Sequence, residues 1–144
     1  MPDDPEYLVP IGKARIARPG EHVTVTAFSR MVELAMQAAE ELQKAGISAE
    51  VIDLRSLRPF DVETVVASVK KTNRIVAIEE GWPFAGIGSE IAAIMMEECF
   101  DWLDASVKRV TGKDVPLPYA ANLERLAVPQ VEDIVAAARE VAYR

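Results

Sequence analysis

Short β-prone runs alternate with amphipathic stretches along most of the chain. Apolar side chains recur at helical spacing in four stretches, within residues 31–45, 62–69, 87–98 and 131–141. The runs between and before them are short and rich in β-branched residues, at 14–17, 23–28, 49–54, 74–78 and 107–111. Strands that alternate with helices favour parallel pairing through right-handed crossovers. The pattern therefore predicts helices on both faces of one sheet.

The first two runs are separated by a turn sequence. In Arg18-Pro19-Gly20-Glu21, proline presets φ and glycine accommodates a positive φ. We interpret residues 14–17 and 23–28 as a hairpin, which gives at least one antiparallel pair. The predicted fold class is α/β: a three-layer α/β/α domain around a mostly parallel mixed sheet of about five strands with one antiparallel edge strand.

The boundaries of the domain and of its helices follow from local signals. Residues 1–10 hold three prolines and three acids and are predicted to form an extended lead-in segment, so the domain spans residues 11–144. Ser29 and Asp61 are predicted to cap the first and second helices. Gly46 and Asn73 suit left-handed stops after those helices. The third helix is expected to begin at about Gly88, and a long loop holds Pro116, Pro118 and Tyr119 before the last helix.

Composition narrows the classes of function. The 144 residues include 23 acids and 16 bases, a net charge of −7, which disfavours nucleic acid and suits a basic partner. One Cys and one His provide neither an internal disulfide nor a metal-ligand cluster. No apolar run is long enough to cross a membrane, and the acidic start lacks the features of a signal or transit peptide, so a reducing, cytoplasmic compartment is the default expectation.

The most unusual stretch is Glu79–Glu90, which follows a predicted strand. Open α/β sheets place ligand sites at that edge, and Gly86 and Gly88 would bring helix N–H groups close to an anion. The glycine spacing departs from the dinucleotide fingerprint, because the next glycine, Gly86, comes five positions after Gly81 and the third position, which needs a small residue, is Ile91. A tight helix start or a partner contact is the favoured interpretation. Convergence of Glu79, Glu80 and Glu90 for proton transfer stays open.

Other candidates have simple structural interpretations. Asp53 ends a strand as a phospho-accepting aspartate would, but the acidic pair needed for magnesium is missing, which favours a solvated strand end or a salt bridge to Arg55 or Arg58. His22 is predicted to lie at the surface and Cys99 to be buried as a small hydrophobe. Asp101-Trp102-Leu103-Asp104 is either a recognition patch for a basic partner or a turn with a half-buried Trp.

Five blocks in order resemble one known family. They are Pro10–Ala14, Val51–Pro59, Glu79–Pro83, Gly86–Glu90 and Arg109–Ala120. From about Leu8 to its end, the chain closely resembles the C-terminal, transketolase-C-like domain of the beta subunits of pyruvate dehydrogenase E1. The pyrimidine-binding N-terminal domain of that family has no counterpart here, so we expect an excised domain.

The resemblance implies a role within a larger assembly. The family forms α2β2 enzymes that use thiamine diphosphate and magnesium to decarboxylate pyruvate and reductively acetylate lipoyl groups of E2. The family's catalytic and cofactor-binding positions lie outside this domain, so no catalytic, cofactor or metal residue is carried over. The expected partners are the E1 alpha subunit, a second beta subunit and the subunit-binding domain of the E2 dihydrolipoyl acetyltransferase, with no nucleic acid and no membrane.

The resemblance also suggests particular contact residues. Asp104 matches the family's E2-docking aspartate, and the terminal carboxylate on Arg144 is expected to contribute to docking. Trp82, Pro83 and Phe84 are expected to face neighbouring subunits, so the isolated domain should form a homodimer or larger assembly. The compartment would be the bacterial cytoplasm, or the mitochondrial matrix in a eukaryote. The alternatives are a branched-chain 2-oxo acid or acetoin dehydrogenase E1 beta fragment, and a free-standing flavodoxin-like domain that binds a ligand at Gly86–Gly88.

Overall fold

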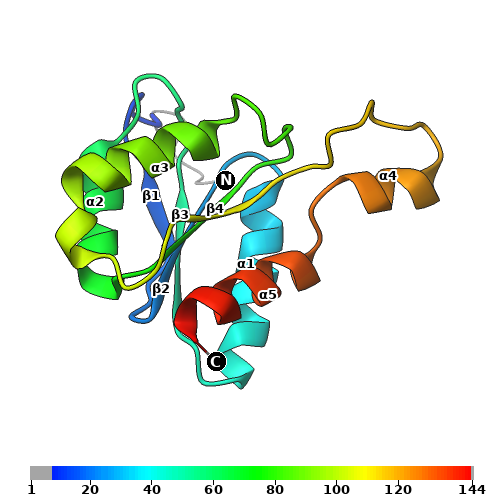
Figure 1. Cartoon of the computed structure of the whole chain (residues 1–144). Coiled ribbons are helices and arrows are strands. Elements are labelled where there is room, and N and C mark those ends of the chain that lie inside the picture. Colours follow the sequence, from blue (N-terminus) through cyan, green and yellow to red (C-terminus); the bar gives the residue numbers. More distant parts are fainter. Residues whose placement is uncertain (1–7, 144) are drawn as a thin grey trace.

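The computed structural model describes residues 8–143 and arranges five strands in one sheet (Figure 1). The strands are β1 (Arg15–Arg18), β2 (Val23–Ala27), β3 (Ala49–Asp53), β4 (Ile75–Ile78) and β5 (Lys108–Val110), in the spatial order β1-β3-β2-β4-β5. The helices are α1 (Met31–Lys44), α2 (Val62–Thr72), α3 (Ile87–Glu98), α4 (Ala121–Ala127) and α5 (Val131–Ala142), with a 3-10 turn at Phe100–Trp102. The predicted α/β class is confirmed.

One edge strand of the sheet is antiparallel, but the predicted hairpin is wrong. β1 pairs antiparallel with β3, with Ile16 opposite Ile52, and does not pair with β2. β2 is occupied on both edges, because it pairs in parallel with β3 and with β4. β1 therefore pairs on the outer edge of β3 and not beside β2.

The turn between β1 and β2 crosses β3 at close range, which explains Gly20. A Cβ at Gly20 would lie 2.2 Å from the backbone of Ala49 and Glu50, so a side chain cannot fit. The Gly20 N–H donates to the carboxylate of Glu50, a buried β3 residue that also pairs with Lys71. The Pro-Gly turn thus carries the chain from β1 past β3 to β2 and does not join two adjacent strands.

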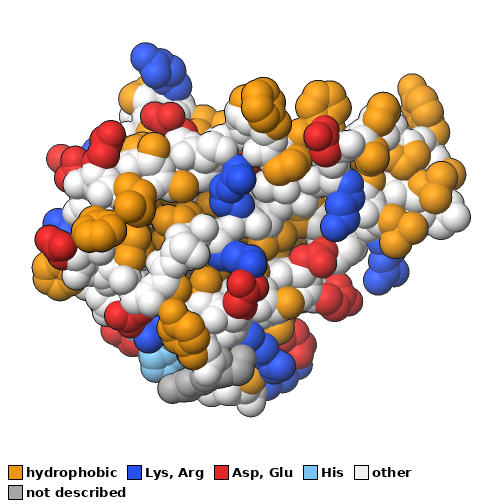
Figure 2. Space-filling model, viewed as in Figure 1, with side chains coloured by type: hydrophobic (Ala, Val, Ile, Leu, Met, Phe, Trp, Pro, Cys, Tyr) orange, Lys and Arg blue, Asp and Glu red, His pale blue; other side chains and the backbone are white. Residues whose placement is uncertain are grey.

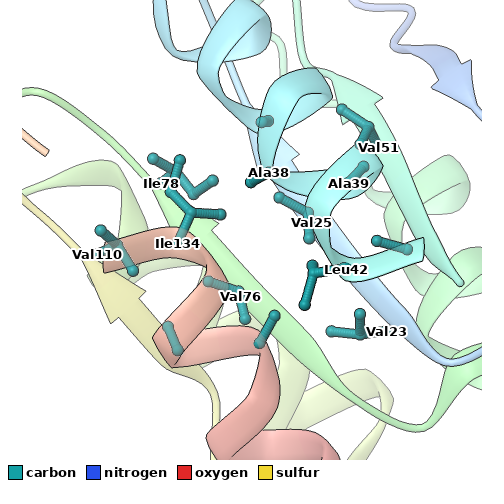
Figure 3. Packing of buried hydrophobic residues seen from close by; sticks show 14 of the residues in the cluster. Val23, Val25, Ala38, Ala39, Leu42, Val51, Val76, Ile78, Val110 and Ile134 are labelled. Carbon is teal, nitrogen blue, oxygen red and sulfur yellow. The ribbon is translucent and has the colours of Figure 1, made fainter. Parts of the chain in front are cut away.

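Two helical layers cover the sheet, as predicted. Alternation along β2 sends Val23, Val25 and Ala27 to one face, where they join the apolar sides of α1 and α5 (Figure 3). On the opposite face, Ile52 of β3 and Ile75 of β4 pack with α2 and α3. Burial of these two clusters is the main term that stabilises the sheet.

Most of the predicted helix ends are confirmed. Asp61 caps α2 through a 3.3 Å bond from the Thr64 N–H, and Gly46 and Asn73 take left-handed φ values of 76° and 62°. The predicted Ser29 cap is wrong. Ser29 itself has φ 53°, which takes it out of the extended conformation of a cap, and α1 begins at Met31 with no side-chain cap.

Residues 113–128 form an arm that stands away from the sheet (Figure 1). The arm contains α4, which the sequence pattern did not predict, and its two ends are joined by the Lys113 N–H and the Ala127 carbonyl at 2.8 Å. α4 was missed because it has little inward-facing apolar side: Leu123 and Leu126 are both exposed. Within the described residues 8–143, no helix is long and apolar enough to cross a bilayer.

Candidate functional site

The end of β4 carries a buried carboxylate. Glu79 follows the last residue of β4 and is 4% exposed. Its Oε2 accepts from the Ile87 N–H and its Oε1 from the Gly88 N–H, each at 3.0 Å. These N–H groups lie in the first turn of α3, where the helix dipole favours negative charge.

The predicted tight helix start is therefore present, and the chain itself supplies the anion. Both N–H groups that a phosphate would use are already bonded to Glu79. A Cβ at Gly86 would lie 2.4 Å from Glu79 Oε1, so the glycine provides room for this carboxylate. The geometry does not support the alternative of a nucleotide site at Gly86–Gly88.

The segment between Glu79 and α3, residues 80–86, is called the β4–α3 loop below. The Gly112 N–H donates to the Gly81 carbonyl at 2.9 Å, and Arg109 Nη1 donates to the Pro83 carbonyl at 2.9 Å. The same Arg109 nitrogen donates to the Ser89 hydroxyl at 2.6 Å. The loop is thereby fastened to β5, to the segment after β5 and to the start of α3.

Trp82 connects this loop to the arm. Its indole Nε1 donates to the Val115 carbonyl at 3.1 Å, although the residue as a whole is 57% exposed. A cavity of about 220 Å³ lies between loop and arm. It is lined by Glu80, Trp82, Lys113, Val115, Leu117, Glu124, Ala127 and Val128. Trp82 therefore contacts the arm of its own chain through a hydrogen bond. The next residue, Pro83, is half-buried.

The loop and the arm expose a large number of apolar side chains. Phe84 is 86% exposed and Tyr119 is fully exposed. Further exposed apolar residues on the arm are Val115, Leu117, Leu123 and Leu126. Figure 2 shows hydrophobic side chains gathered over the arm, at the right of the view. We call Trp82, Phe84, Tyr119 and the four further arm residues the loop–arm surface. Large exposed apolar areas of this kind mark sites of interaction.

Asp104 lies at the other end of β4. Its Oδ2 is 2.7 Å from Arg74 Nη2, and Arg74 directly precedes β4. The Asp104 N–H donates to the Asn73 carbonyl, and its own carbonyl accepts from the Tyr143 hydroxyl at 2.9 Å. The carboxylate is half-exposed and paired within the chain. Arg144, whose terminal carboxylate is also expected to contribute to docking, lies outside the described residues.

The turn interpretation of the Asp101–Asp104 segment is confirmed, whereas its role as a recognition patch for a basic partner stays a prediction. Trp102 is half-exposed in a 3-10 turn, and Lys70 Nζ lies 5.9 Å from the centre of its ring. The nearby side chains of Met96 and Phe100 are more than half exposed. Exposed apolar side chains therefore precede Asp104 along the chain, in a segment separate from the loop–arm surface.

The remaining candidates have structural roles. Asp53 pairs with Arg55 at 3.9 Å, as expected, and with Arg15 at 3.5 Å. His22 is half-buried, and its Nδ1 accepts from the Ser48 N–H at 2.9 Å. Cys99 is fully buried as predicted, and burial raises the pKa of its thiol.

The acids near the end of β4 do not form a proton-transfer pair. Glu80 faces Arg30 at 3.9 Å, whereas Glu79 is turned into the start of α3. Among residues 8–143, no three His, Cys, Asp or Glu side chains are grouped closely enough to hold a metal ion.

The sequence pattern did not predict two features near the candidate site, the arm and the contact of Glu79 with the start of α3. An acid directly after a buried strand and seven residues before a glycine is the only local sign of that contact.

The fold defines a class before any comparison: a three-layer α/β domain with a mostly parallel five-stranded sheet and an antiparallel edge strand. The sequence pattern described as transketolase, C-terminal domain matches residues 12–134. The chain belongs to the transketolase C-terminal domain family.

Two curated relatives come from eukaryotes and one from a bacterium. The pyruvate dehydrogenase E1 component subunit beta-1, mitochondrial, of Oryza sativa subsp. japonica is 60% identical over 98% of this chain. The Dictyostelium discoideum mitochondrial subunit beta is 58% identical over 98%, and the Rickettsia bellii subunit beta is 56% identical over 94%. The predicted resemblance is confirmed. The chain spans only 38%, 40% and 42% of these three relatives.

Solved structures agree with the fold. A split gene transketolase in an inactive beta4 tetramer has a TM-score of 0.83 and 30% identity, covering 97% of this chain and 44% of that chain. A 2-oxoglutarate:ferredoxin oxidoreductase from Magnetococcus marinus has a TM-score of 0.60 over 90% of this chain and 19% of its own. At 13% identity, the second structure shows a shared fold only.

Proposed function

We propose that this chain is the C-terminal domain of the beta subunit of a thiamine diphosphate-dependent pyruvate dehydrogenase E1. Its work is to hold neighbouring subunits together and to dock E2. The identity of 60% over 98% of the chain to a pyruvate dehydrogenase beta subunit supports pyruvate over a branched-chain 2-oxo acid or acetoin as the substrate of the parent enzyme. That enzyme decarboxylates pyruvate and reductively acetylates the lipoyl groups of E2, in the bacterial cytoplasm or the mitochondrial matrix.

The chemistry is assigned to other parts of the heterotetramer. Thiamine diphosphate and magnesium act in the full-length enzyme with the E1 alpha subunit. Of the acids near the end of β4, Glu79 is bonded to the N–H groups of Ile87 and Gly88 and Glu80 faces Arg30, so the two carboxylates do not share a site as an acid–base pair.

The loop–arm surface is the observation that carries the assembly role. Its residues are apolar, exposed and fastened through Trp82 and Arg109, so little ordering entropy is lost when a partner covers them. Covering apolar side chains stabilises a complex by about 25 cal/mol per Å² removed from water. A second beta subunit is the partner we assign to this surface, and the relative solved as a beta4 tetramer supports association among beta chains.

The Asp104 region is assigned to E2. The subunit-binding domain of E2 is basic, the chain carries a net charge of −7, and Asp104 with the carboxylate of Arg144 would offer it two negative groups. Trp102 and Phe100 add exposed aromatic area beside Asp104. Because Asp104 and the β4–α3 loop lie at opposite ends of β4, the two kinds of partner would not compete for one surface.

Two measurements test this proposal. Titration calorimetry of the purified chain with an E2 subunit-binding domain should give saturable binding that weakens with salt. In the same preparation, pyruvate with added thiamine diphosphate and magnesium should not be turned over. Absence of binding under low salt would contradict the docking role, and keto acid turnover by the chain alone would contradict the assignment of chemistry to other parts.

A further inference from the structure

We propose that Glu79 is a positioning residue for subunit assembly: by holding the start of α3, its buried carboxylate fixes the β4–α3 loop so that Phe84 is presented to a second copy of this chain. This inference rests on the proposed assembly function. It assigns a role to a residue that touches no partner itself.

Burial of the carboxylate is costly unless it is well bonded. A charged group that is 4% exposed loses most of its hydration. Two separate N–H donors at 3.0 Å, both at the positive end of α3, offset that loss. Both hydrogen bonds come from residues 87 and 88, so the position of the carboxylate and the position of the helix start determine each other.

The site is shaped for this carboxylate. A Cβ would lie 2.4 Å from Glu79 Oε1 at Gly86 and 3.0 Å from it at Gly88, so both positions leave room that a side chain would fill. At Gly81, on the other side of the loop, a Cβ would keep an ordinary distance of 3.6 Å from Oε2. The close approach is therefore confined to the end of the loop that enters α3.

The loop needs this support because it contains an unfavourable backbone conformation. Ala85 has φ 56°, in the left-handed region that is unfavourable for an L-residue with a side chain. Such a residue persists where its surroundings fix it on both sides. Glu79 fixes the residues that follow Ala85, while Arg109 bonds to the Pro83 carbonyl before it.

Phe84 lies between these two fixed points. It is 86% exposed and is not a member of either apolar cluster, so its own packing cannot set its position. The loop backbone sets it instead. A buried ionic group is also a poor source of net stability compared with an apolar side chain of similar size, which favours a role in specifying the conformation of the loop.

The test compares Glu79→Gln with Glu80→Gln in the whole chain. Glutamine keeps the size of the side chain but removes the charge and faces one N–H donor with its own NH2 group. Glu80 is adjacent, more exposed and paired with Arg30 at 3.9 Å, so Glu80→Gln is the matched control. Hydrogen exchange should become about tenfold faster at residues 81–88 in Glu79→Gln, with strands β2 to β4 unchanged, and should not change in Glu80→Gln.

Self-association then tests whether Glu79 acts through Phe84. Sedimentation should show that Glu79→Gln and Phe84→Ala each weaken association, and that the double variant is no weaker than Phe84→Ala alone, because coupled residues are not additive. Additive losses would overturn the proposal, as would unchanged exchange in the loop. If Phe84→Ala leaves association unchanged, the assembly role of the surface fails, while the exchange data still decide whether Glu79 fixes the loop.

Chemical rescue provides a readout that general destabilisation would not give. Glu79→Ala vacates the space at the start of α3 and leaves two N–H donors without the carboxylate. Added formate should then slow exchange at residues 81–88 and strengthen association in Glu79→Ala, and should do neither in the unmodified chain. If Glu79→Ala stays folded and does not respond to formate, the carboxylate is not what positions the loop; if it does not fold, the Glu79→Gln comparison decides.

Discussion

Arg74 and Asp104 form an ion pair, with Nη2 and Oδ2 only 2.7 Å apart, across the start of β4. Arg74 also donates from Nη1 to the His22 carbonyl at 3.3 Å, so the guanidinium is held by the sheet and holds the carboxylate in turn. The Asp104 carboxylate is thus held in place, half-exposed and paired with a positive charge. A basic partner would therefore meet a carboxylate that is already paired with Arg74. It would either bind beside Arg74 or share the carboxylate with it.

Asp104→Ala is expected to weaken binding to the E2 subunit-binding domain by roughly fivefold at low salt, equivalent to about 1 kcal/mol for a partly exposed charge pair. Calorimetry at two salt concentrations checks this, and the difference should shrink at the higher one. Asp101→Ala is the matched control, since Asp101 is exposed and lies three residues away. An equal loss in both variants would show a general charge effect, and no loss in either would remove Asp104 from the docking surface.

Gly86→Ala is expected to lower the free energy of unfolding by about 1–3 kcal/mol, because the new methyl group meets the buried Glu79 carboxylate. Gly81→Ala should change it by no more than about 0.5 kcal/mol, since its Cβ has normal contact distances. Denaturant unfolding of the two variants measures the difference. Equal stability of the two variants would show that the close packing around Glu79 is not rigid.

Asp61 should make the domain sensitive to acid. Burial raises the pKa of Asp61, but hydrogen bonds from the Ala14 N–H and from Thr64, together with Lys13, outweigh burial and hold it below its usual value. Because the folded pKa is the lower one, Asp61 contributes stability above its unfolded pKa of about 4, and this contribution is lost as pH falls through the folded pKa.

The matching variant is Asp61→Asn, which keeps a capping side chain but removes the charge. At pH 7 it should be about 1–2 kcal/mol less stable than the unmodified chain, and the difference should narrow at pH 3 and below. Asp114→Asn, at an exposed position, should show no such pH-dependent difference. A constant difference for Asp61→Asn across this range would contradict the assigned ionic role.

Cys99 should be unreactive while the chain is folded. The side chain is fully buried, and burial is the main cause that raises the pKa of its thiol, which leaves little thiolate. A thiol reagent should label the native chain only at the rate of unfolding and should label the denatured chain at once. Rapid complete labelling of the native chain would mean that the packing of α3 against the sheet opens easily.

The helices and most of their ends were predictable because they depend on residues close together in the sequence. The α1, α2, α3 and α5 segments each have an apolar side that packs on the sheet, so their periodicity indicated them correctly. Asp61, Gly46 and Asn73 end or begin helices through contacts within a few residues, and these too were predicted. Ser29 was mistaken for a cap because its left-handed φ depends on the turn it occupies.

Strand order and the site depend on contacts between distant residues. Gly20 indicated a turn, but its true neighbour is the backbone of Ala49 and Glu50, about thirty residues further along the chain. That contact could not be read from the turn sequence. α4 has exposed leucines on an arm outside the core, so the apolar pattern that reveals core helices is weak there. The Glu79 contact joins a strand end to a helix start and has no periodic signal at all.

Sedimentation equilibrium of the purified chain tests the assembly role most directly, over about two orders of magnitude in concentration. The mean mass should rise above the monomer value of 15.8 kDa with concentration. Leu126→Ser, at an exposed position of α4, should move it back toward that value without loss of stability. A mass that stays at 15.8 kDa throughout would contradict the assignment of this domain to subunit assembly.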